Sequence, residues 1–558
     1  MRVLAWLALV AGGCSVSAKE PEAEPDPKGW TISVDMSGTQ RFVHPETSMS
    51  WPVAGVATAT EGVASIDVAG MPVMFGADGA FAAEVPVSLG LTPVPVLVRD
   101  AAGHERKGDR TLLAARFLPD TEHNRVAASL VLDNTILAAM SGGIASQAAN
   151  VDIAGEILAR EYLSQDSQCA TWSVHAHQGT VNVKLVQDRG DLWLHIQIPN
   201  VYVYFEGECQ GPLRLIPLAG EMGGTIDVWS QLTPHAGEGP CLEAFHHTAP
   251  EVTIAGWGFN VWGTGGPLQN WMVTAFSGEK ATQARTQLTT EVASRAGELL
   301  TTQLANISVF DRTSQLELLD RPIGLHLCLA ALDKVGNALV ARIAAQALGA
   351  GVREAPGAPQ IDGATPAVPA KELVLDGNLV GQLLFASWRD GGLTRAVSDA
   401  DISVLQILVP ELVDRFPSSS TAQVTVDAEL PPLVRATPGG PGDLSVEVGD
   451  VMIDLTVEGK RIFRFGVVLN MALDLVPVAG KLQPMVIDAT AKAVLLDELY
   501  DGPDAALEAA VQVQISKLAA SLLGASAAIA LPELPGLGSP VAVSADAGGR
   551  FLHVTLGP

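Results

Sequence analysis

The most constraining feature of this sequence is a pair of long alternating segments around a single turn. TWSVHAHQGTVNVKLV and DLWLHIQIPNVYVYFEGE flank Gln187-Asp188-Arg189-Gly190, and a further strand is expected near residues 224 to 229. Alternation of apolar and polar residues is typical of strands that bury one face. Strands of this length predict a strongly curved antiparallel sheet of the barrel type.

A long amphipathic helix is expected after this sheet. Gly265-Gly266-Pro267 marks its start, because proline fits the first helical position. Trp271 and Phe276 belong to its apolar stripe, which Leu288 and Leu304 continue. A helix over 268 to 306 would reach ~60 Å at ~1.5 Å per residue. The predicted unit is therefore one long helix lying along a curved sheet.

The order of elements occurs twice along the chain. LVLDNTILAAM begins at Leu130 and LVLDGNLVGQL at Leu373, and each is interpreted as part of an apolar helix, over 124 to 164 and 372 to 394. The shared tetrapeptide can arise by chance, so the duplicated plan is inferred from the matching order of the later elements. Long strands come after each copy, and Asp501-Gly502-Pro503 opens a second long helix. The Pro-, Gly- and Ala-rich segment 349–370 predicts a linker between the halves.

The N-terminal residues predict export. Met1-Arg2, the apolar run VLAWLALV and the small residues AGGCSVSA form a secretory signal. Either residues 1–14 hold a lipobox and Cys14 becomes the lipidated residue, or Val16-Ser17-Ala18 is an ordinary cleavage site and Cys14 is discarded. The acidic, Pro-rich segment 15–29 predicts an extended tether, which favours the anchored form. By analogy with other bacterial lipoproteins, we expect an outer-membrane lipoprotein facing the periplasm or the cell surface; the alternative is a secreted or periplasmic soluble protein.

Residues 30–118 predict a separate all-β module. Short alternating strands are separated by turns such as Gly76-Ala77-Asp78-Gly79. The order of Val68 to Val73, Asp78 to Phe81 and Asp100 to Gly103 resembles the bacterial immunoglobulin-like domains of exported proteins. Such modules usually act as spacers, and we expect a stalk here; a binding role is the less favoured alternative.

Charge and motifs exclude several functions. The net charge of −27 argues against nucleic acid and against a strongly cationic lipid-headgroup surface. No nucleophile elbow, P-loop or HExxH motif occurs, so we expect neither an enzyme nor a cofactor. His175 and His177 share a face of one strand and could begin a metal site, but solvent-facing histidines are the favoured interpretation. Cys169, Cys209, Cys241 and Cys328 suggest disulfides without fixing their connectivity, and free buried thiols are the alternative.

From about residue 123 to 558 the chain resembles the BPI/LBP/CETP family of the tubular lipid-binding (TULIP) superfamily. ELVLDGNLVGQLLFASWRDGGL, residues 372 to 393, carries the strongest similarity, through Asp376, Leu383, Trp388, Gly392 and Leu393. The stretch from Val404 to Val448 and the late LPELPGL add to it. The similarity lies in the order of the elements and in the pattern of apolar and polar residues, with few identical residues.

The resemblance implies an α+β fold: two tandem barrels in a boomerang, over 121–348 and 371–558, each with long helices packed on a strongly twisted antiparallel sheet. The all-β sandwich would precede them. The family's strand-to-helix disulfide has no counterpart here, since the helix at 268 to 306 lacks cysteine. Cys169 with Cys209 is then the tentative pair, leaving Cys241 and Cys328 paired or free.

The resemblance also implies apolar tunnels that hold acyl chains. The candidate lining residues are Leu130, Leu137, Met140, Trp271, Phe276, Leu379, Leu383, Phe385, Trp388, Leu507, Val511 and Ile515. Because each buried CH₂ contributes about 0.8 kcal/mol, a tunnel for one chain would bind it strongly. We therefore expect a lipid-binding or lipid-transfer lipoprotein of the cell envelope, with lipid and membrane as its partners. The alternative is a surface adhesin or glycan-binding protein on an Ig-like stalk.

Overall fold

The structure is a computed structural model. It describes residues 29–45, 50–138, 141, 169–210, 215–263, 311–351, 353–365, 367–398, 422–524, 529–530 and 538–557, with scattered residues between 267 and 297 and between 409 and 416. Most of these residues lie in strands. The helices with defined bounds are α4 (Gly377–Arg389) and α7 (Asp504–Gly524).

The predicted α+β class is therefore wrong, and the protein is a β-rich fold. α4 has 13 residues and α7 has 21, so neither approaches the ~60 Å helix that the sequence suggested. Most of the segment 268 to 306 lies outside the described residues. The fold is built on long strands rather than on long helices laid along a sheet.

Residues 32 to 114 form a sandwich of two sheets. One sheet has the order β1-β3-β6 and the other β2-β8-β7-β4-β5. Val53, Phe81, Ile66 and Val96, drawn from both sheets, are buried in one core, which is why the strands alternate. The strand bounds are β1 Ile32–Asp35, β2 Phe42–Val43, β3 Ser50–Ala59, β4 Val63–Val68, β5 Met71–Pro72, β6 Ala80–Pro86, β7 Gly90–Asp100 and β8 Glu105–Ala114.

A central sheet joins the two halves of the remaining chain. Its order is β17-β18-β19-β10-β21-β30-β29, and a separate pair links β9 (Arg116–Leu118) to β20 (Ala358–Gln360). The sheet therefore combines strands from both sides of the 349–370 linker. The bounds are β10 Asn124–Val131, β17 Asp311–Leu318, β18 Arg321–Val335, β19 Ala338–Leu348, β21 Glu372–Asp376, β29 Pro540–Ala545 and β30 Phe551–Leu556.

The two LVLD copies meet in this central sheet. The first copy begins in β10, which ends at Val131, and the second lies wholly in β21. Leu130 lies opposite Leu373, and Ser129 lies opposite Val374. The prediction that helices begin at 124 and 372 is therefore wrong at these ends. Each copy instead ends in a helix cap, since Asp133 accepts from the Ile136 amide at 2.9 Å and Asp376 from the Asn378 amide at 3.0 Å. The two copies thus meet at the Leu130–Leu373 pair, and the aspartate of each copy caps the helical residues that follow.

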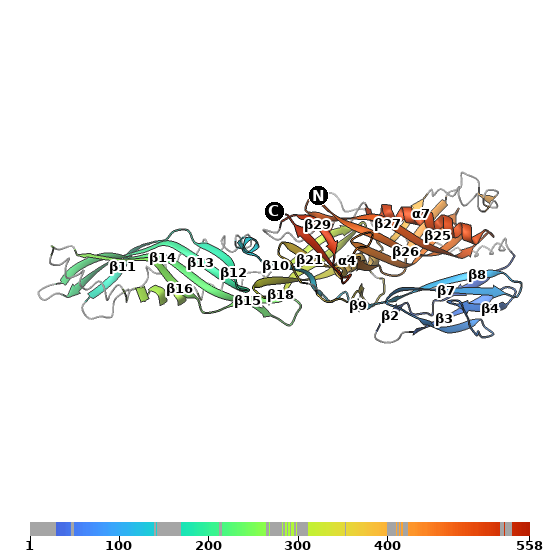
Figure 1. Cartoon of the computed structure of the whole chain (residues 1–558), viewed down its shortest axis with the longest axis horizontal. Coiled ribbons are helices and arrows are strands. Elements are labelled where there is room, and N and C mark those ends of the chain that lie inside the picture. The colour runs from blue at the N-terminus through green and yellow to red at the C-terminus, as the bar shows by residue number, and fades with distance from the viewer. Residues whose placement is uncertain are drawn as a thin grey trace, which may run out of the picture.

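The distal sheet extends from one end of the central sheet (Figure 1). It has the order β11-β13-β14-β15, with β12 pairing β13 and β16 pairing β14. This confirms the long antiparallel hairpin expected around Asp188 and Gly190, because β12 and β13 pair across that turn. The bounds are β11 Cys169–His177, β12 Asn182–Asp188, β13 Asp191–Gln210, β14 Leu215–Ala236, β15 Leu242–His247 and β16 Glu251–Gly263.

The C-terminal sheet lies on the other side of the central sheet and carries α7 beside β27. Its order is β22-β23-β25-β26-β27-β28, with β24 pairing β25. The bounds are β22 Thr394–Ser398, β23 Ala422–Ala428, β24 Leu433–Ala436, β25 Leu444–Val457, β26 Lys460–Val478, β27 Lys481–Glu498 and β28 Ile529–Ala530.

The sandwich packs along the C-terminal sheet instead of projecting as a stalk (Figure 1). Leu113 and Ala115 share a small apolar cluster with Leu430 and Leu433. The Thr111 amide donates to Asp450 at 2.6 Å, and Lys107 contacts Glu508 of α7 at 2.8 Å. The module is thus a docked part of the molecule, and its expected role as a projecting spacer does not fit this contact.

Candidate functional site

The tunnel-lining residues predicted on α4 lie in a closed core. Twelve of its 13 residues are buried, from Gly377 to Trp388. A tunnel wide enough for an acyl chain also admits water, so its lining would keep accessible surface. Leu383 keeps 2% and Trp388 1% of their surface exposed. Together with the buried Leu379 and Phe385, they pack in one core, and Phe385 also borders a small pocket of about 230 Å³ whose lining is mainly charged. A tunnel lining at these positions stays a prediction.

Polar contacts hold α4 in place. The fully buried Asp376 accepts from Arg550 at 2.6 Å and from the Asn124 side chain at 3.0 Å, in addition to capping α4. The Trp388 indole donates to the Ala428 carbonyl at 2.7 Å. These contacts tie β10, β21, β23 and β30 to one short helix. The strongest motif of the sequence is therefore a structural hub of the molecule.

The other predicted lining residues differ in burial, and some of them lie outside the described part of the chain. Leu130 and Leu137 are buried, and Leu507 and Ile515 of α7 are buried while Val511 is half-buried against the same core. Leu130 lies on strand β10 rather than on a helix. Met140, Trp271, Phe276 and the lipidation candidate Cys14 lie outside the described residues.

The inner face of the distal sheet has a different character. On β13 the side chains of Val201, Val203 and Phe205 point to the buried side, whereas Tyr202 and Tyr204 point outward. The buried side continues across the sheet through Met222, which lies opposite Val203, and Phe259, which lies opposite Met222. Strict alternation over this length separates one apolar face from one polar face.

Aromatic rings on this inner face keep part of their surface accessible. Phe259 stacks on Phe205 with ring centroids 5.7 Å apart and on Trp257 at 6.4 Å. Trp257 and Phe259 are half-buried and pack against the main core. Gly220 lies beside Phe205, and an added Cβ there would lie 2.6 Å from the Asn260 carbonyl oxygen and 2.4 Å from the Phe205 ring. We define the inner apolar face by Val203, Phe205, Met222, Trp257 and Phe259.

Helical residues cover part of the inner side of this sheet. The described residues between 282 and 297 are helical, and Leu288 and Val292 are buried in the same core as Phe205. The Ser141 hydroxyl donates to the Leu137 carbonyl at 2.7 Å and accepts from the Leu185 amide of β12 at 2.7 Å. Apolar side chains from helical segments thus meet the sheet.

The candidate histidines lie on the outer face of the distal sheet. His175 and His177 of β11 line an open pocket with Asn200, Tyr202 and Tyr204. Among the described residues, the group that could bring three metal ligands together consists of His123, Cys241 and Cys328. Neither His175 nor His177 belongs to it. Those two sulfurs form a disulfide, so they offer no thiolate to a metal.

The structure joins Cys241 to Cys328, with Cα atoms 5.6 Å apart. This resolves one of the alternatives that the sequence left open. It ties the start of β15 in the distal sheet to β18 in the central sheet. The strand register places Cys169 opposite Cys209, and a disulfide between them stays a prediction.

A cluster of charges lies beneath the docked sandwich. Asp450, whose side chain is 2% exposed, lies 3.6 Å from Arg41 and 3.8 Å from Arg110. Burial raises the pKa of Asp450, although both guanidiniums oppose that change. On neighbouring β8, burial and the charge of Asp450 raise the pKa of Asp109 to about 6. This cluster is an ionic contact between two modules.

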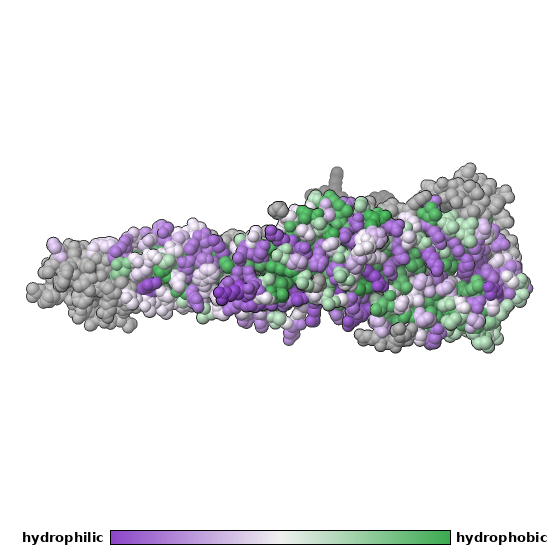
Figure 2. All heavy atoms as spheres, viewed as in Figure 1, coloured by the Kyte–Doolittle hydropathy of each residue, from purple (hydrophilic) through white to green (hydrophobic). Residues whose placement is uncertain are grey.

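The described helices include none that is long and apolar enough to cross a membrane. Figure 2 shows mainly hydrophilic and neutral residues over the described part of the distal sheet, and hydrophobic residues scattered over the C-terminal half. The burial pattern of β13, rather than this view, places Val201, Val203 and Phe205 on the inner side of the sheet.

No family model matches the chain, and no curated protein matches it. Among solved structures, the chain is similar to a lipopolysaccharide binding protein at 13% identity, over 77% of this chain and 98% of that chain, with a TM-score of 0.39. It is also similar to P47 of Clostridium botulinum E1 at 7% identity, over 78% of this chain and 99% of that chain, with a TM-score of 0.23. Scores this low carry no statement about what this chain binds.

Proposed function

We propose that the protein binds the acyl chains of a lipid along the inner apolar face of the distal sheet. The single observation that carries this proposal is the accessible aromatic surface of Trp257 and Phe259 on an otherwise buried apolar face. Such surface gains free energy when hydrocarbon covers it, at about 0.8 kcal/mol per buried CH₂. The closed core around α4 offers no comparable surface.

The dimensions of the face suit an acyl chain. From Leu194 to Phe205 the inner side chains of β13 are apolar, apart from the bulge between Ile198 and Val201. At ~3.3 Å per residue these strand positions span ~36 Å. One leaflet of a bilayer holds its chains within ~15 Å, which is half of the ~30 Å hydrocarbon core. The inner apolar face is therefore long enough for the tails of one lipid. The proposed function is binding alone and involves no reaction.

The test uses the full chain purified without detergent. Organic extraction and mass spectrometry should find bound lipid, and the protein should bind the fluorescent fatty acid cis-parinaric acid saturably. Phe259→Ala should weaken binding several-fold, because it removes ring area from the face. Phe259→Asp should abolish binding, because a carboxylate there would have to be desolvated.

Trp262→Ala is the matched control for these variants. Trp262 lies on the same strand but its side chain is 44% exposed, so its loss should leave fatty-acid binding unchanged. Far-UV circular dichroism establishes that each variant is folded. A folded Phe259→Asp protein that binds like the parent would overturn the proposal.

We also propose an N-terminal lipid anchor at Cys14, which would attach this carrier to the cell envelope. Labelled palmitate should enter the parent chain when it is expressed in a Gram-negative host. The Cys14→Ser chain should take up no label, while Cys169→Ser should be labelled as the parent is. Equal labelling of the Cys14→Ser and parent chains would contradict the anchor.

A further inference from the structure

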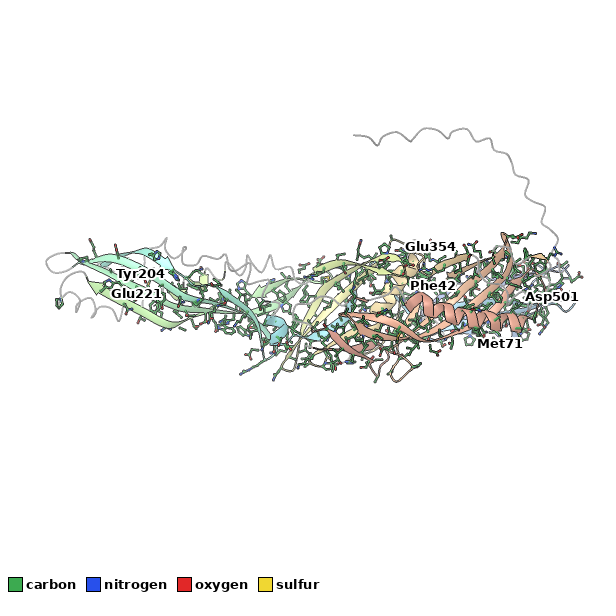
Figure 3. The ribbon with its side chains drawn as sticks, turned by 90° about the horizontal axis from the view of Figure 1, so that it is seen from above. Phe42, Met71, Tyr204, Glu221, Glu354 and Asp501 are labelled. Atoms are coloured by element: carbon green, nitrogen blue, oxygen red, sulfur yellow. A yellow bond between two sulfur atoms is a disulfide. The ribbon has the colours of Figure 1, made fainter. Side chains whose placement is uncertain are left out.

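The outer face of the distal sheet carries a row of side chains that the proposed lipid site does not use. In register, His175 of β11 lies opposite Tyr204 of β13, Tyr204 opposite Glu221 of β14, and Glu221 opposite Asn260 of β16. Directly opposed residues share a face, so these four side chains cross the outer face in one line. Figure 3 labels Tyr204 and Glu221 at this place, far from the sandwich.

The neighbouring row carries side chains on β11 and β13 but only glycines on β14 and β16. His177 lies opposite Tyr202, Tyr202 opposite Gly223, and Gly223 opposite Gly258. A Cβ added at Gly258 would meet open space. The pocket along His175, His177, Asn200, Tyr202 and Tyr204 has a volume of about 650 Å³. Bare backbone beside two tyrosines therefore gives a shallow trough.

Two aromatic rings on this outer face are exposed to solvent, one at the pocket and one two strands away. Tyr204 is 41% exposed and Trp262 is 44% exposed. Trp262 lies two residues beyond Asn260 on β16 and therefore on the same face. Two strand spacings and two residues separate Tyr204 from Trp262, which is ~12 Å. Rings at this separation can each stack on a different unit of one chain-like ligand.

Polar groups around the rings are fixed by contacts. The Asn260 amide donates to the Glu221 carboxylate at 3.1 Å, which leaves the second carboxylate oxygen for a ligand hydroxyl. His177 Nδ1 lies 3.3 Å from the Asn200 carbonyl, at a β-bulge between Ile198 and Val201 where Asn200 has a φ of 52°. Bulges of this kind re-aim side chains next to binding sites.

The charge of the face selects among ligands. Glu206 and Glu208 follow Tyr204 on the same side of β13 and are exposed, and Glu221 is half-buried. No lysine or arginine occurs among the described residues of the two rows. Carboxylates without cations repel phosphate and other anions, which disfavours anionic lipid headgroups. They accept hydrogen bonds from hydroxyl groups of a neutral ligand.

We infer that this outer face binds a neutral oligosaccharide. The C–H faces of sugar rings would stack on Tyr204 and Trp262, as aromatic surfaces with one apolar side accept them. Glu221, Asn260 and the two histidines would bind the hydroxyl groups. The site is separate from the inner apolar face, because its side chains point to the opposite side of the same strands.

Isothermal titration of the full chain with cellotetraose, maltotetraose and tetra-N-acetylchitotetraose tests this inference. At least one tetrasaccharide should bind with a Kd between about 10 μM and 1 mM. Tyr204→Ala and Trp262→Ala should each weaken that binding by about tenfold or more. Met74→Ala, at a side chain 91% exposed on the sandwich, and Phe259→Ala should leave it unchanged.

Absence of binding to all three sugars would overturn the inference, as would binding that neither aromatic variant weakens. Phosphatidylcholine vesicles form a further arm. If Tyr204→Ala and Trp262→Ala reduce vesicle binding and no sugar binds, the face is a lipid-surface contact and the inference is wrong. Failure of the proposed lipid function appears separately, in fatty-acid binding by the Phe259 variants.

Discussion

Asp109 is a residue whose ionisation should affect the docking of the sandwich. Its pKa is raised from 3.8 to about 6 by burial and by the neighbouring Asp450 charge, with Lys492 acting in the opposite sense. A carboxyl whose pKa is higher in the folded state binds protons more tightly there, so its own contribution to stability is greatest at low pH. The contribution of Asp109 should fall as the pH rises from 3.8 through about 6, and stay at the lower level above that range.

Asp109→Asn should therefore stabilise the protein above pH 7, by roughly 2 to 3 kcal/mol. The gain should shrink as the pH falls towards 4, because the parent carboxyl is then protonated. Urea unfolding at several pH values measures it. Glu84→Gln, at an exposed carboxylate on the far sheet of the sandwich, should show no such pH-dependent gain. An Asp109→Asn protein that is less stable than the parent at pH 7.5 would contradict the raised pKa of Asp109.

At the scale of elements, sequence alternation predicted some strands well and some helices poorly. The hairpin around residue 189 was predictable because its alternation is long and its turn contains Gly190. LVLD at 130 and 373 was assigned to helices, but the first copy begins in a strand and the second lies wholly in one. A short continuous apolar run fits a fully buried strand and a buried helix equally well, so periodicity cannot separate them.

The candidate sites show the same limit. α4 matched the expected motif, yet its side chains are packed core, because a motif does not reveal whether space remains beside it. Tyr202 and Tyr204 could have been singled out, since they alternate with buried Val201, Val203 and Phe205. Their location beside His175 depends on strand register, which the sequence does not contain.

The Cys241–Cys328 disulfide should hold the distal sheet to the central sheet. It closes a sequence separation of 87 residues between β18 and the start of β15. Changing both residues to serine should lower the free energy of unfolding by about 2 to 4 kcal/mol. Hydrogen exchange should accelerate in β15 and β18 and stay unchanged in β25 to β27. Uniform acceleration across all sheets would show that the bond has no local role.

At the scale of the whole molecule, the sandwich and the C-terminal sheet form one docked body. A Cβ built at Gly449 would lie 3.2 Å from the Thr111 Cβ. Disulfides join Cβ atoms about 3.5 to 4.5 Å apart, so small adjustments would suffice. Thr111→Cys combined with Gly449→Cys should therefore form a disulfide under oxidising conditions, as mass spectrometry of non-reduced peptides would show. Gly449→Cys alone is the control. If the two introduced cysteines stay reduced under oxidising conditions, the sandwich is not docked as described.

The molecule then has two lobes with different properties. The C-terminal lobe is closed by α4 and supported by the sandwich, whereas the distal sheet keeps accessible apolar surface on its inner side. Because of this asymmetry, we propose lipid binding for the distal lobe rather than for both lobes. The proposed site therefore lies in the half of the chain that the sandwich, among the described residues, does not contact.

Lipid binding by the distal lobe can be measured by titrating cis-parinaric acid into the delipidated parent, Phe259→Asp and Trp262→Ala chains. We expect saturable binding by the parent and Trp262→Ala chains, and none by folded Phe259→Asp. Equal binding by all three chains, or no binding by the parent, would contradict the assignment of the lipid site to the inner apolar face.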